Sequence, residues 1–287
     1  MVAGASKAAG TGSLREAPPG FDVRPYIVGA PGLMAGVANV IMQLGLPGVG
    51  YGVVESKVYD GQAMRHPVKR GRTTFSYLAV AALGNDHDRA VYRKAVNRQH
   101  AQVRSTSESP VEYNAFNPEL QRWVAACLYW GFEDVYTKLH GPLPAEIVDD
   151  FYQYGARMGT TLQMRPDMWP ADRAAFEEYW QDGLANIHID DTVREYLDGL
   201  VNLGNLPGPL RRLFVRFNRF VTIGYLPPQF RAEMRYTWTD RDERAFRRLL
   251  RVIGAVDRRM PIPVRMFPFN FFLADVRRRA RKGIPLV

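Results

Sequence analysis

Apolar residues recur along most of the chain at intervals of three and four positions, which is the spacing of one face of an α-helix. This periodicity predicts helices at about 33–44, 48–57, 68–83, 86–104, 118–139, 144–163, 171–185, 191–202, 209–223, 239–256 and 270–281. Sustained alternation of apolar and polar residues, the pattern of a half-buried strand, is nearly absent. We therefore expect an all-α fold, built as a single multi-helix domain.

Residues that begin and end helices stand at several of these boundaries. The stretch "FNPEL" places Asn117 as an N-cap and Pro118 in the first turn. The segments "WPADRAAFEEYW" and "YTWTDRDERAF" begin with similar signals and continue with acidic first turns. Gly84, Gly141 and Gly204 are expected to end three of the helices.

Thirty residues in succession, from Pro25 to Val54, carry no formal charge. A segment of this length can span a bilayer. It contains seven glycines, however, and Asn39 and Gln43 lie at helical spacing on one side. These features favour two buried helices that break at "GLPGVG" over a membrane span.

The first residues differ from the rest of the chain. Residues 1–24 are small, polar and rich in Gly and Pro, without the apolar core of a secretory signal, and predict a flexible N-terminal leader. Residues 25–287 are expected to form the all-α domain. The single cysteine, Cys127, excludes an internal disulfide and a cysteine-cluster metal site, and its apolar neighbours predict burial. These features favour a cytoplasmic protein.

Positive charge is concentrated at the C-terminal end. Of the net charge of +9, +8 lies in the last 48 residues, which contain thirteen Lys and Arg against five Asp and Glu. The densest run, "DVRRRARKG", directly follows the aromatic "MFPFNFF". It predicts a basic C-terminal helix, either with a solvated end or in peripheral contact with an anionic membrane. No nucleic-acid partner is expected, because no recognition motif accompanies the charges.

Several common catalytic motifs do not occur in the sequence. There is no His-Glu-x-x-His pair of zinc hydrolases and no Gly-x-Ser-x-Gly nucleophile turn. The glycines of "GLPGVGYG" lack the preceding strand and the Gly-Lys-Ser/Thr ending of a phosphate-binding loop. The sequence therefore gives no support to a hydrolase or a nucleotide-binding protein.

One histidine, His100, occupies an apolar helix face. In the window "VNRQHAQVR" it lies four residues after Val96 and three before Val103, so its imidazole is expected to point inward with these side chains. The other four histidines lie in polar segments or near helix ends. An inward imidazole is either a hydrogen-bonded core residue or a metal ligand, and the spacing alone leaves both open.

Two further places in the sequence could carry chemistry. Arg70 and Thr74 lie one turn apart in "KRGRTTFSYLAVAALG", where they could bind an anionic group, or the arginine could cap a neighbouring helix. Glu55 stands alone at the end of the uncharged segment, in "GVVESK". It is either a desolvated carboxylate or the first exposed residue after a buried helix.

Five motifs, in this order, resemble the catalytic domain of the MpaB and rubber-oxygenase (latex-clearing protein) family, whose members are histidine-ligated b-type haem oxygenases. They are "GVVES", "RGRTTFSYLAVAALG", "VNRQHAQVRS", "YNAFNPELQRWVAACL" and "LPPQFR". The family's similar forms are an Arg-x-x-x-Thr helix, a His-x-x-Val-x-Gly helix, and a Tyr-x-Ala followed by a Pro-Glu-Leu…Trp helix. Ser105 replaces the glycine of the second form, and Ala125 stands where many relatives have a histidine after Trp-Val. Each motif is moderately specific, and the resemblance rests on all of them together.

The resemblance implies a role for individual residues. It makes His100 the proximal iron ligand of a haem b, and Arg70 and Thr74 a polar pair on the distal side. Glu55 lies near the place of a catalytic carboxylate. Thr73 stands where rubber oxygenases have a lysine, so a distal lysine ligand is not expected.

A haem also needs cations for its propionates and an apolar wall around the iron. Arg72, Arg98 and Arg104 could supply the cations, and the resemblance places Trp123 among the cofactor-binding residues. We therefore expect a haem pocket between the helices, with the protein supplying position and electrostatics.

Two functions from different classes follow. The favoured one is a haem b-dependent oxygenase that uses dioxygen on an apolar, isoprenoid- or lipid-like substrate, with oxidative cleavage of a carbon–carbon double bond implied by the resemblance. The alternative is a non-enzymatic helical protein that binds lipid or a membrane surface. The presence or absence of haem in the purified protein distinguishes them.

Overall fold

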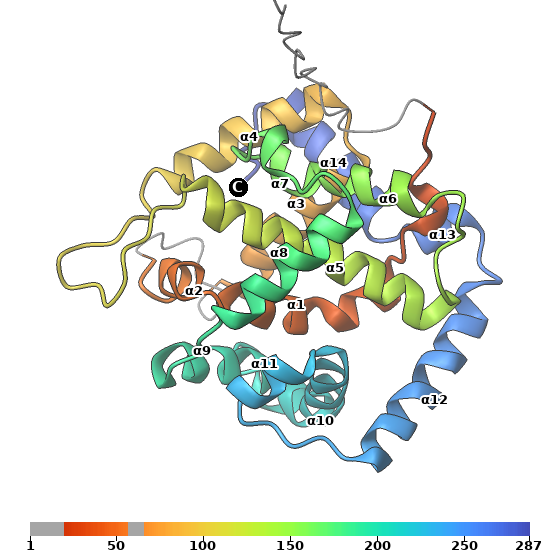
Figure 1. Cartoon of the computed structure of the whole chain (residues 1–287). Coiled ribbons are helices and arrows are strands. Elements are labelled where there is room, and N and C mark those ends of the chain that lie inside the picture. Colours follow the sequence, from red (N-terminus) through yellow and green to blue (C-terminus); the bar gives the residue numbers. More distant parts are fainter. Residues whose placement is uncertain (1–19, 57–65) are drawn as a thin grey trace, which may run out of the picture.

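The computed structural model describes residues 20–56 and 66–287, whose regular structure is helical (Figure 1). The α-helices are α1 (Gly36–Leu44), α2 (Pro47–Val54), α3 (Pro67–Leu83), α4 (Asp86–His100), α5 (Pro118–His140), α6 (Val148–Gly155), α7 (Arg157–Thr160), α8 (Arg173–Ala185), α9 (Asp191–Val201), α10 (Gly208–Tyr225), α11 (Pro228–Glu233), α12 (Asp240–Asp257), α13 (Ile262–Arg265) and α14 (Phe269–Arg281). Short 3-10 helices span Arg24–Tyr26, Ala30–Ala35 and Pro166–Met168. These residues contain no strand, only an isolated bridge between Arg104 and Asn114. The predicted all-α fold is confirmed.

Of the predicted leader, residues 1–24, the first nineteen residues lie outside the part of the chain that the structure describes. From Val23 onward the chain is part of the core: Val23 and Ile27 are buried in the same apolar cluster as Val276 near the C-terminus. The division between residues 24 and 25 stays a prediction.

The break predicted at "GLPGVG" is confirmed, because Ala30–Leu44 and Pro47–Val54 meet at an angle of 110°. The amide of Asn39 donates to the carbonyl of Cys127 on α5 at 2.7 Å, and Gln43 donates to Asn39 at 2.7 Å. Cys127 is fully buried, as predicted. Among the described residues no single helix is both long and apolar enough to cross a membrane, and only this bent pair meets the two criteria together.

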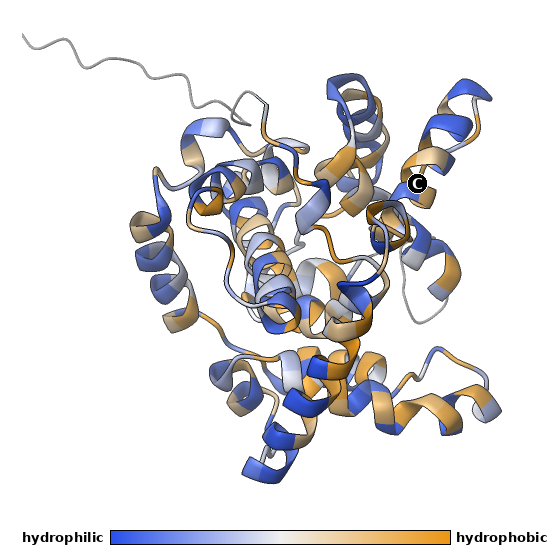
Figure 2. Ribbon diagram, turned by 90° about the vertical axis from the view of Figure 1, so that its right-hand side faces the viewer, coloured by the Kyte–Doolittle hydropathy of each residue, from blue (hydrophilic) through white to orange (hydrophobic). Residues whose placement is uncertain are grey.

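Helix α5 runs through the middle of the molecule, and the helices around it carry alternating apolar and polar bands (Figures 1 and 2). Aromatic side chains fill much of the space beside it. Trp123 stacks on Trp180 of α8 with ring centroids 5.2 Å apart. A Cβ at Gly183 would collide with the Trp123 ring, so a glycine is required where α8 crosses α5.

Helices α3 and α4 form an antiparallel pair that α14 covers, and this arrangement brings the beginning of α3 beside the end of α4. The turn between them is fixed by a capping box of Asn85 and Asp88. At the same turn Arg277 of α14 pairs with Asp88 at 2.7 Å. Further along, the hydroxyl of Tyr92 donates to the carbonyl of Thr73 at 2.7 Å, which holds the two helices in register.

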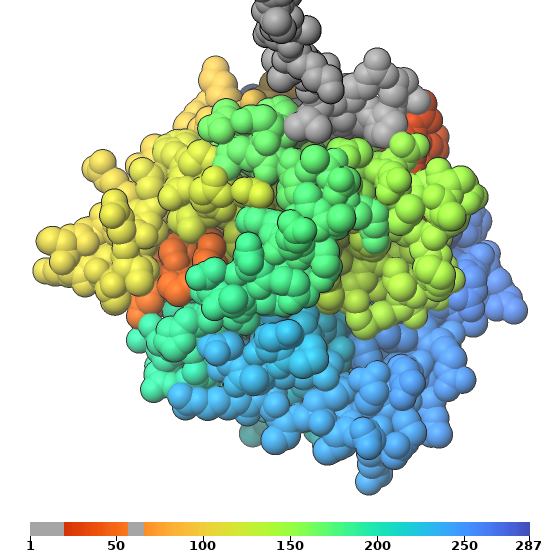
Figure 3. All heavy atoms as spheres, viewed as in Figure 1, coloured from red at the N-terminus to blue at the C-terminus, as the bar shows by residue number. Residues whose placement is uncertain are grey.

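Helices α9 to α12 lie below α1, and α11 and α12 cover the lower part of the face seen in Figure 3. Most predicted helix ends are confirmed: Asn117 and Thr239 cap α5 and α12, and Gly141 follows α5 with a φ of 92°. Gly204 also closes its helix, because its N–H donates to the carbonyl of Gly199 at 2.8 Å just after α9 ends at Val201. The left-handed residue there is Leu203, with a φ of 51°, and not the glycine.

Candidate functional site

His100 is the last residue of α4, on the same side of the helix as the fully buried Tyr92. Its Nδ1 atom is buried and has no hydrogen-bond partner among the described residues. Burial, together with the positive charge of Arg70, lowers the pKa of His100 from 6.5 to about 4. The imidazole is therefore neutral at neutral pH, the form in which it binds a metal. The edge of the Phe116 ring lies beside it, with centroids 6.2 Å apart.

Arg70 and Thr74 lie one turn apart near the beginning of α3. Arg70 is exposed, and its charge lowers the pKa of His100 and acts on the phenols of Tyr92 and Tyr196 as well. Thr74 is half-buried one turn further along. The structure thus brings His100 within range of the Arg70 charge, although the two residues lie thirty positions apart in the sequence. Their chemical roles stay predictions.

Glu55 follows the last residue of α2, where two hydroxyl groups hold its carboxylate. Its Oε2 atom accepts hydrogen bonds from Ser109 at 2.7 Å and from Tyr113 at 2.8 Å. Burial and the neighbouring Glu55 carboxylate raise the pKa of Tyr113, so its phenol stays protonated and keeps donating. One turn earlier, Tyr51 donates its hydroxyl to Asp190 before α9. Glu55 is therefore a positioned carboxylate rather than a freely moving one.

The segment after His100 joins the histidine to Glu55. It turns back on itself through backbone hydrogen bonds from Ser105 to Tyr113 at 2.8 Å and from Ala115 to Val103 at 3.0 Å. A Cβ at Gly52, one turn before Glu55, would lie 3.5 Å from the Tyr113 ring and 3.8 Å from Val103. The ends of α2 and α4 therefore both contact this segment. We call the four predicted site residues His100, Arg70, Thr74 and Glu55 the histidine cluster, and the interaction that the structure records among them is that of Arg70 with His100.

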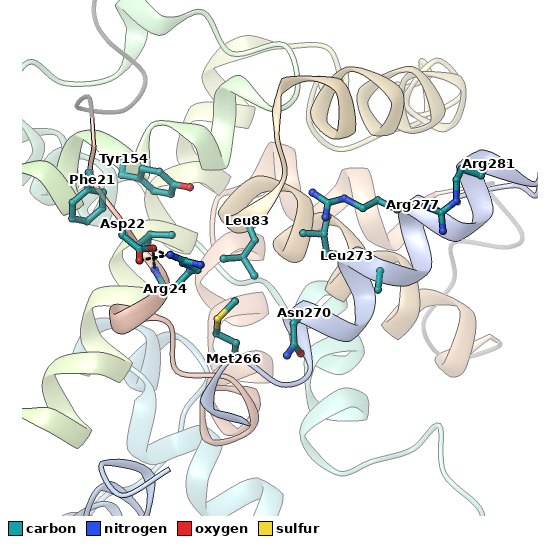
Figure 4. A pocket seen from close by; sticks show the side chains of 12 residues that line it. Phe21, Asp22, Arg24, Leu83, Tyr154, Met266, Asn270, Leu273, Arg277 and Arg281 are labelled. Atoms are coloured by element: carbon teal, nitrogen blue, oxygen red, sulfur yellow. Dashed lines mark hydrogen bonds and ion pairs between the residues drawn. The ribbon is translucent and has the colours of Figure 1, made fainter. Parts of the chain in front are cut away.

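A cavity of about 490 Å³ lies elsewhere, between residues 21–24, the end of α3 and α14 (Figure 4). Leu83, Met266 and Leu273 form its apolar part, and the Asp22–Arg24 ion pair lies at its rim. Leu83 is thirteen residues from Arg70 on α3, a distance of about 20 Å along the helix. The cavity is therefore separate from the histidine cluster.

Residues 25–255 match the family model described as "ER-bound oxygenase mpaB/B'/Rubber oxygenase, catalytic domain". The chain belongs to this oxygenase family. Two uncharacterised proteins, from Mycobacterium bovis (strain ATCC BAA-935 / AF2122/97) and Mycobacterium tuberculosis (strain ATCC 25618 / H37Rv), are each 51% identical to it over 250 residues. The matches cover 87% of this chain and 98% of each relative. No solved structure matches the chain.

The other residues that the resemblance to the oxygenase family had marked make contacts of their own. Arg72 donates to the carbonyl of Leu286 at 2.9 Å, near the C-terminus. Arg98 lines a hollow of about 450 Å³ on α4, together with Ala90, Arg93, Lys94 and Asn97. The Trp123 indole donates to the carbonyls of Met42 and Gln43, both at 3.2 Å. Arg104 is exposed in the segment that follows His100.

Sequence reasoning did not single out the residues that support the histidine cluster. Ser109 and Tyr113 hold Glu55, while Tyr196 of α9 lies within reach of the Arg70 charge. Tyr113 opens the quoted "YNAFNPEL" motif, which was the one available signal. Its partner lies 58 positions earlier, so no local periodicity could reveal the contact.

The residues of the histidine cluster fit a haem. A haem iron requires a neutral imidazole as its protein ligand, and burial keeps His100 in that form. Within residues 20–56 and 66–287, no three His, Cys, Asp or Glu side chains are grouped to hold a metal ion. A haem does not need such a group, because one histidine holds the iron and the porphyrin nitrogens supply most of its other ligands.

Proposed function

We propose that the protein is a haem-dependent oxygenase that uses dioxygen on an apolar substrate of isoprenoid or lipid type. Membership of the oxygenase family supports the general class of reaction. The observation that carries the haem proposal is the Nδ1 atom of His100, which is buried without a partner in a ring that stays neutral. A buried polar atom without a partner is uncommon in a folded protein, and a bound group that the ring faces would explain it.

His100 would hold the iron, and the rest of the histidine cluster would act on the groups around it. The haem would supply the activation of dioxygen, which no amino-acid side chain performs. The guanidinium of Arg70 would stabilise negative charge that develops on the reacting groups, and the hydroxyl of Thr74 would add a hydrogen bond. Glu55 would accept a proton from the substrate, because its carboxylate is fixed by two donors. The reaction that we propose for these residues is the oxidative cleavage of a carbon–carbon double bond.

Haem content of the purified protein tests the proposal without any substrate. We expect the wild type, supplied with haem, to show a Soret absorption band. His100→Ala should remove the iron's bond to the protein and lose most of this band, while far-ultraviolet circular dichroism stays helical. The substitution leaves a cavity near a helix end, so we expect it to cost roughly 1–3 kcal/mol of unfolding free energy.

His87→Ala is the matched control, because His87 lies on the same helix but is exposed at its beginning. It should retain haem as the wild type does. If His100→Ala keeps full haem occupancy with an unchanged spectrum, the assigned ligand is wrong. A wild type that stays colourless in the presence of haem would instead favour the non-enzymatic lipid-binding protein.

A further inference from the structure

The first half of α10 presents an apolar face that the described residues leave uncovered. Leu210, Leu213, Phe214 and Phe217 are 48%, 69%, 48% and 47% exposed. Their spacing of three and four residues places them in one stripe along the helix. The stripe continues to Val221, which is 1% exposed. The same helix face is therefore core at one end and open at the other.

The charge of α10 is of one sign. Gly208–Tyr225 contains four arginines and no Asp or Glu. Arg211 and Arg216 are exposed on the two flanks of the apolar stripe, each about 100–120° around the helix from it, whereas Arg212 is exposed on the opposite face. Arg219 also lies on that opposite face, with its guanidinium over the ring of Tyr236 at 4.6 Å.

Single exposed apolar residues are common on protein surfaces, whereas a continuous stripe of four large ones marks an interaction site. The stripe is about 10 Å long, since each helical residue advances the chain by about 1.5 Å. A protein partner would need acidic groups opposite the arginines and an apolar groove for the stripe. A bilayer with anionic lipids offers both, with phosphates at the surface and hydrocarbon beneath.

We propose that the first half of α10 docks the protein onto an anionic lipid bilayer. The apolar stripe enters the boundary between headgroups and acyl chains, and the flanking arginines contact lipid phosphates. This surface differs from the basic C-terminal region to which the sequence pointed. The docking does not require haem, so its test is independent of the oxygenase proposal.

Co-sedimentation of the full chain with vesicles tests the proposal. Vesicles of phosphatidylcholine and phosphatidylserine should bind the wild type more tightly than vesicles of phosphatidylcholine alone, and added salt should weaken the binding. Leu213→Ser/Phe217→Ser should bind the anionic vesicles at least about tenfold more weakly, because two large apolar side chains no longer enter the bilayer. Both residues are exposed, so the fold should be retained, which circular dichroism checks.

Phe267→Ser/Phe271→Ser is the matched control, since these two aromatics are 52% and 58% exposed but lie elsewhere, just before α14 and in its first turn. It should bind vesicles as the wild type does. A loss of binding in this control but not in the α10 variant would overturn the proposal. So would wild-type binding that is equal for neutral and anionic vesicles.

A second copy of the chain is the competing occupant of the stripe. Light scattering without lipid should show the same oligomeric state for the wild type and for Leu213→Ser/Phe217→Ser. A wild-type dimer that dissociates in the variant, together with absent vesicle binding, would assign the stripe to self-association and overturn the proposal.

Discussion

The Glu55 carboxylate shows how single residues prepare the histidine cluster. Ser109 and Tyr113 donate to one and the same oxygen, Oε2. Tyr113 is 5% exposed, and its hydroxyl makes a part-buried hydrogen bond to Glu55. A buried donor that loses its acceptor costs more than an exposed one, which makes the pair accessible to a stability measurement.

We predict that Tyr113→Phe lowers the free energy of unfolding by about 1–2 kcal/mol, because it removes a hydrogen bond to a charged group. Glu55→Gln should have a cost of similar size. The double variant should lose less unfolding free energy than the two single variants lose together, since both substitutions remove the same hydrogen bond. Urea unfolding of the four proteins measures this coupling. Strictly additive costs would mean that the two side chains do not interact.

At this scale the sequence was informative where a residue conflicted with its local pattern. His100 stood out as a polar residue on an apolar face, and the isolated charge of Glu55 stood out at the end of an uncharged segment. Ser109 and Tyr113 fit the pattern of their local sequence and did not stand out. Their importance comes from a chain reversal after His100 that brings them to α2, and such long-range contacts leave no periodic trace.

A buried group of charged and polar side chains links the ends of α5, α12 and α13. His140 at the end of α5 and Asp257 at the end of α12 lie 2.9 Å apart, and Arg265 at the end of α13 contacts Asp257 at 3.1 Å. Asp257 is 1% exposed. Burial and the adjacent Arg265 lower the pKa of His140, because Arg265 already supplies the positive charge that Asp257 needs.

The interaction of His140 with Asp257 and Arg265 predicts that the stability of the protein depends on pH. With a pKa below the ordinary 6.5, folded His140 binds a proton less readily than unfolded His140 does. The contribution to stability is therefore complete above pH 6.5 and is lost as the pH falls below it. His140→Gln keeps a donor for Asp257 but cannot titrate. Between about pH 7 and pH 5, urea unfolding should show a larger loss of stability for the wild type than for the variant, and equal losses would remove His140 as the cause.

Helices were predictable as elements, and their interruptions were less so. The helix predicted at 144–163 is α6 and α7 with irregular segments around them. A Cβ at Gly155 would lie 2.5 Å from the Tyr129 ring, so the chain approaches α5 too closely there for any other residue. This constraint comes from a contact with another helix, so the spacing of apolar residues within the segment cannot predict it. The short helices α11 and α13 were missed because four to six residues are too few to show a period.

The distribution of charge over the whole molecule differs from its distribution along the sequence. The last 48 residues carry most of the net charge, yet many of their arginines are bound within the fold. Arg277 pairs with Asp88 of α4, while Arg278 and Arg279 both pair with Asp275. Helix α10 has only four arginines, but no acidic residue and an open apolar stripe beside them. Position and pairing thus move the best candidate for a membrane contact from the C-terminal region to α10.

The final prediction separates these two regions in the intact protein. If the C-terminal run touched the bilayer, each of its arginines near the surface would contribute about 1 kcal/mol, and Arg278→Gln/Arg279→Gln would weaken binding to anionic vesicles roughly 30-fold. We expect instead that this variant weakens binding by less than about threefold. Both side chains pair with Asp275, so their attraction to the bilayer acts over a distance at which salt screens it. Arg211→Gln/Arg216→Gln removes the same number of charges from the two flanks of the α10 stripe and should produce the large effect. Vesicle co-sedimentation of both variants at one salt concentration makes the comparison, and the opposite ranking would return the membrane contact to the C-terminal helix.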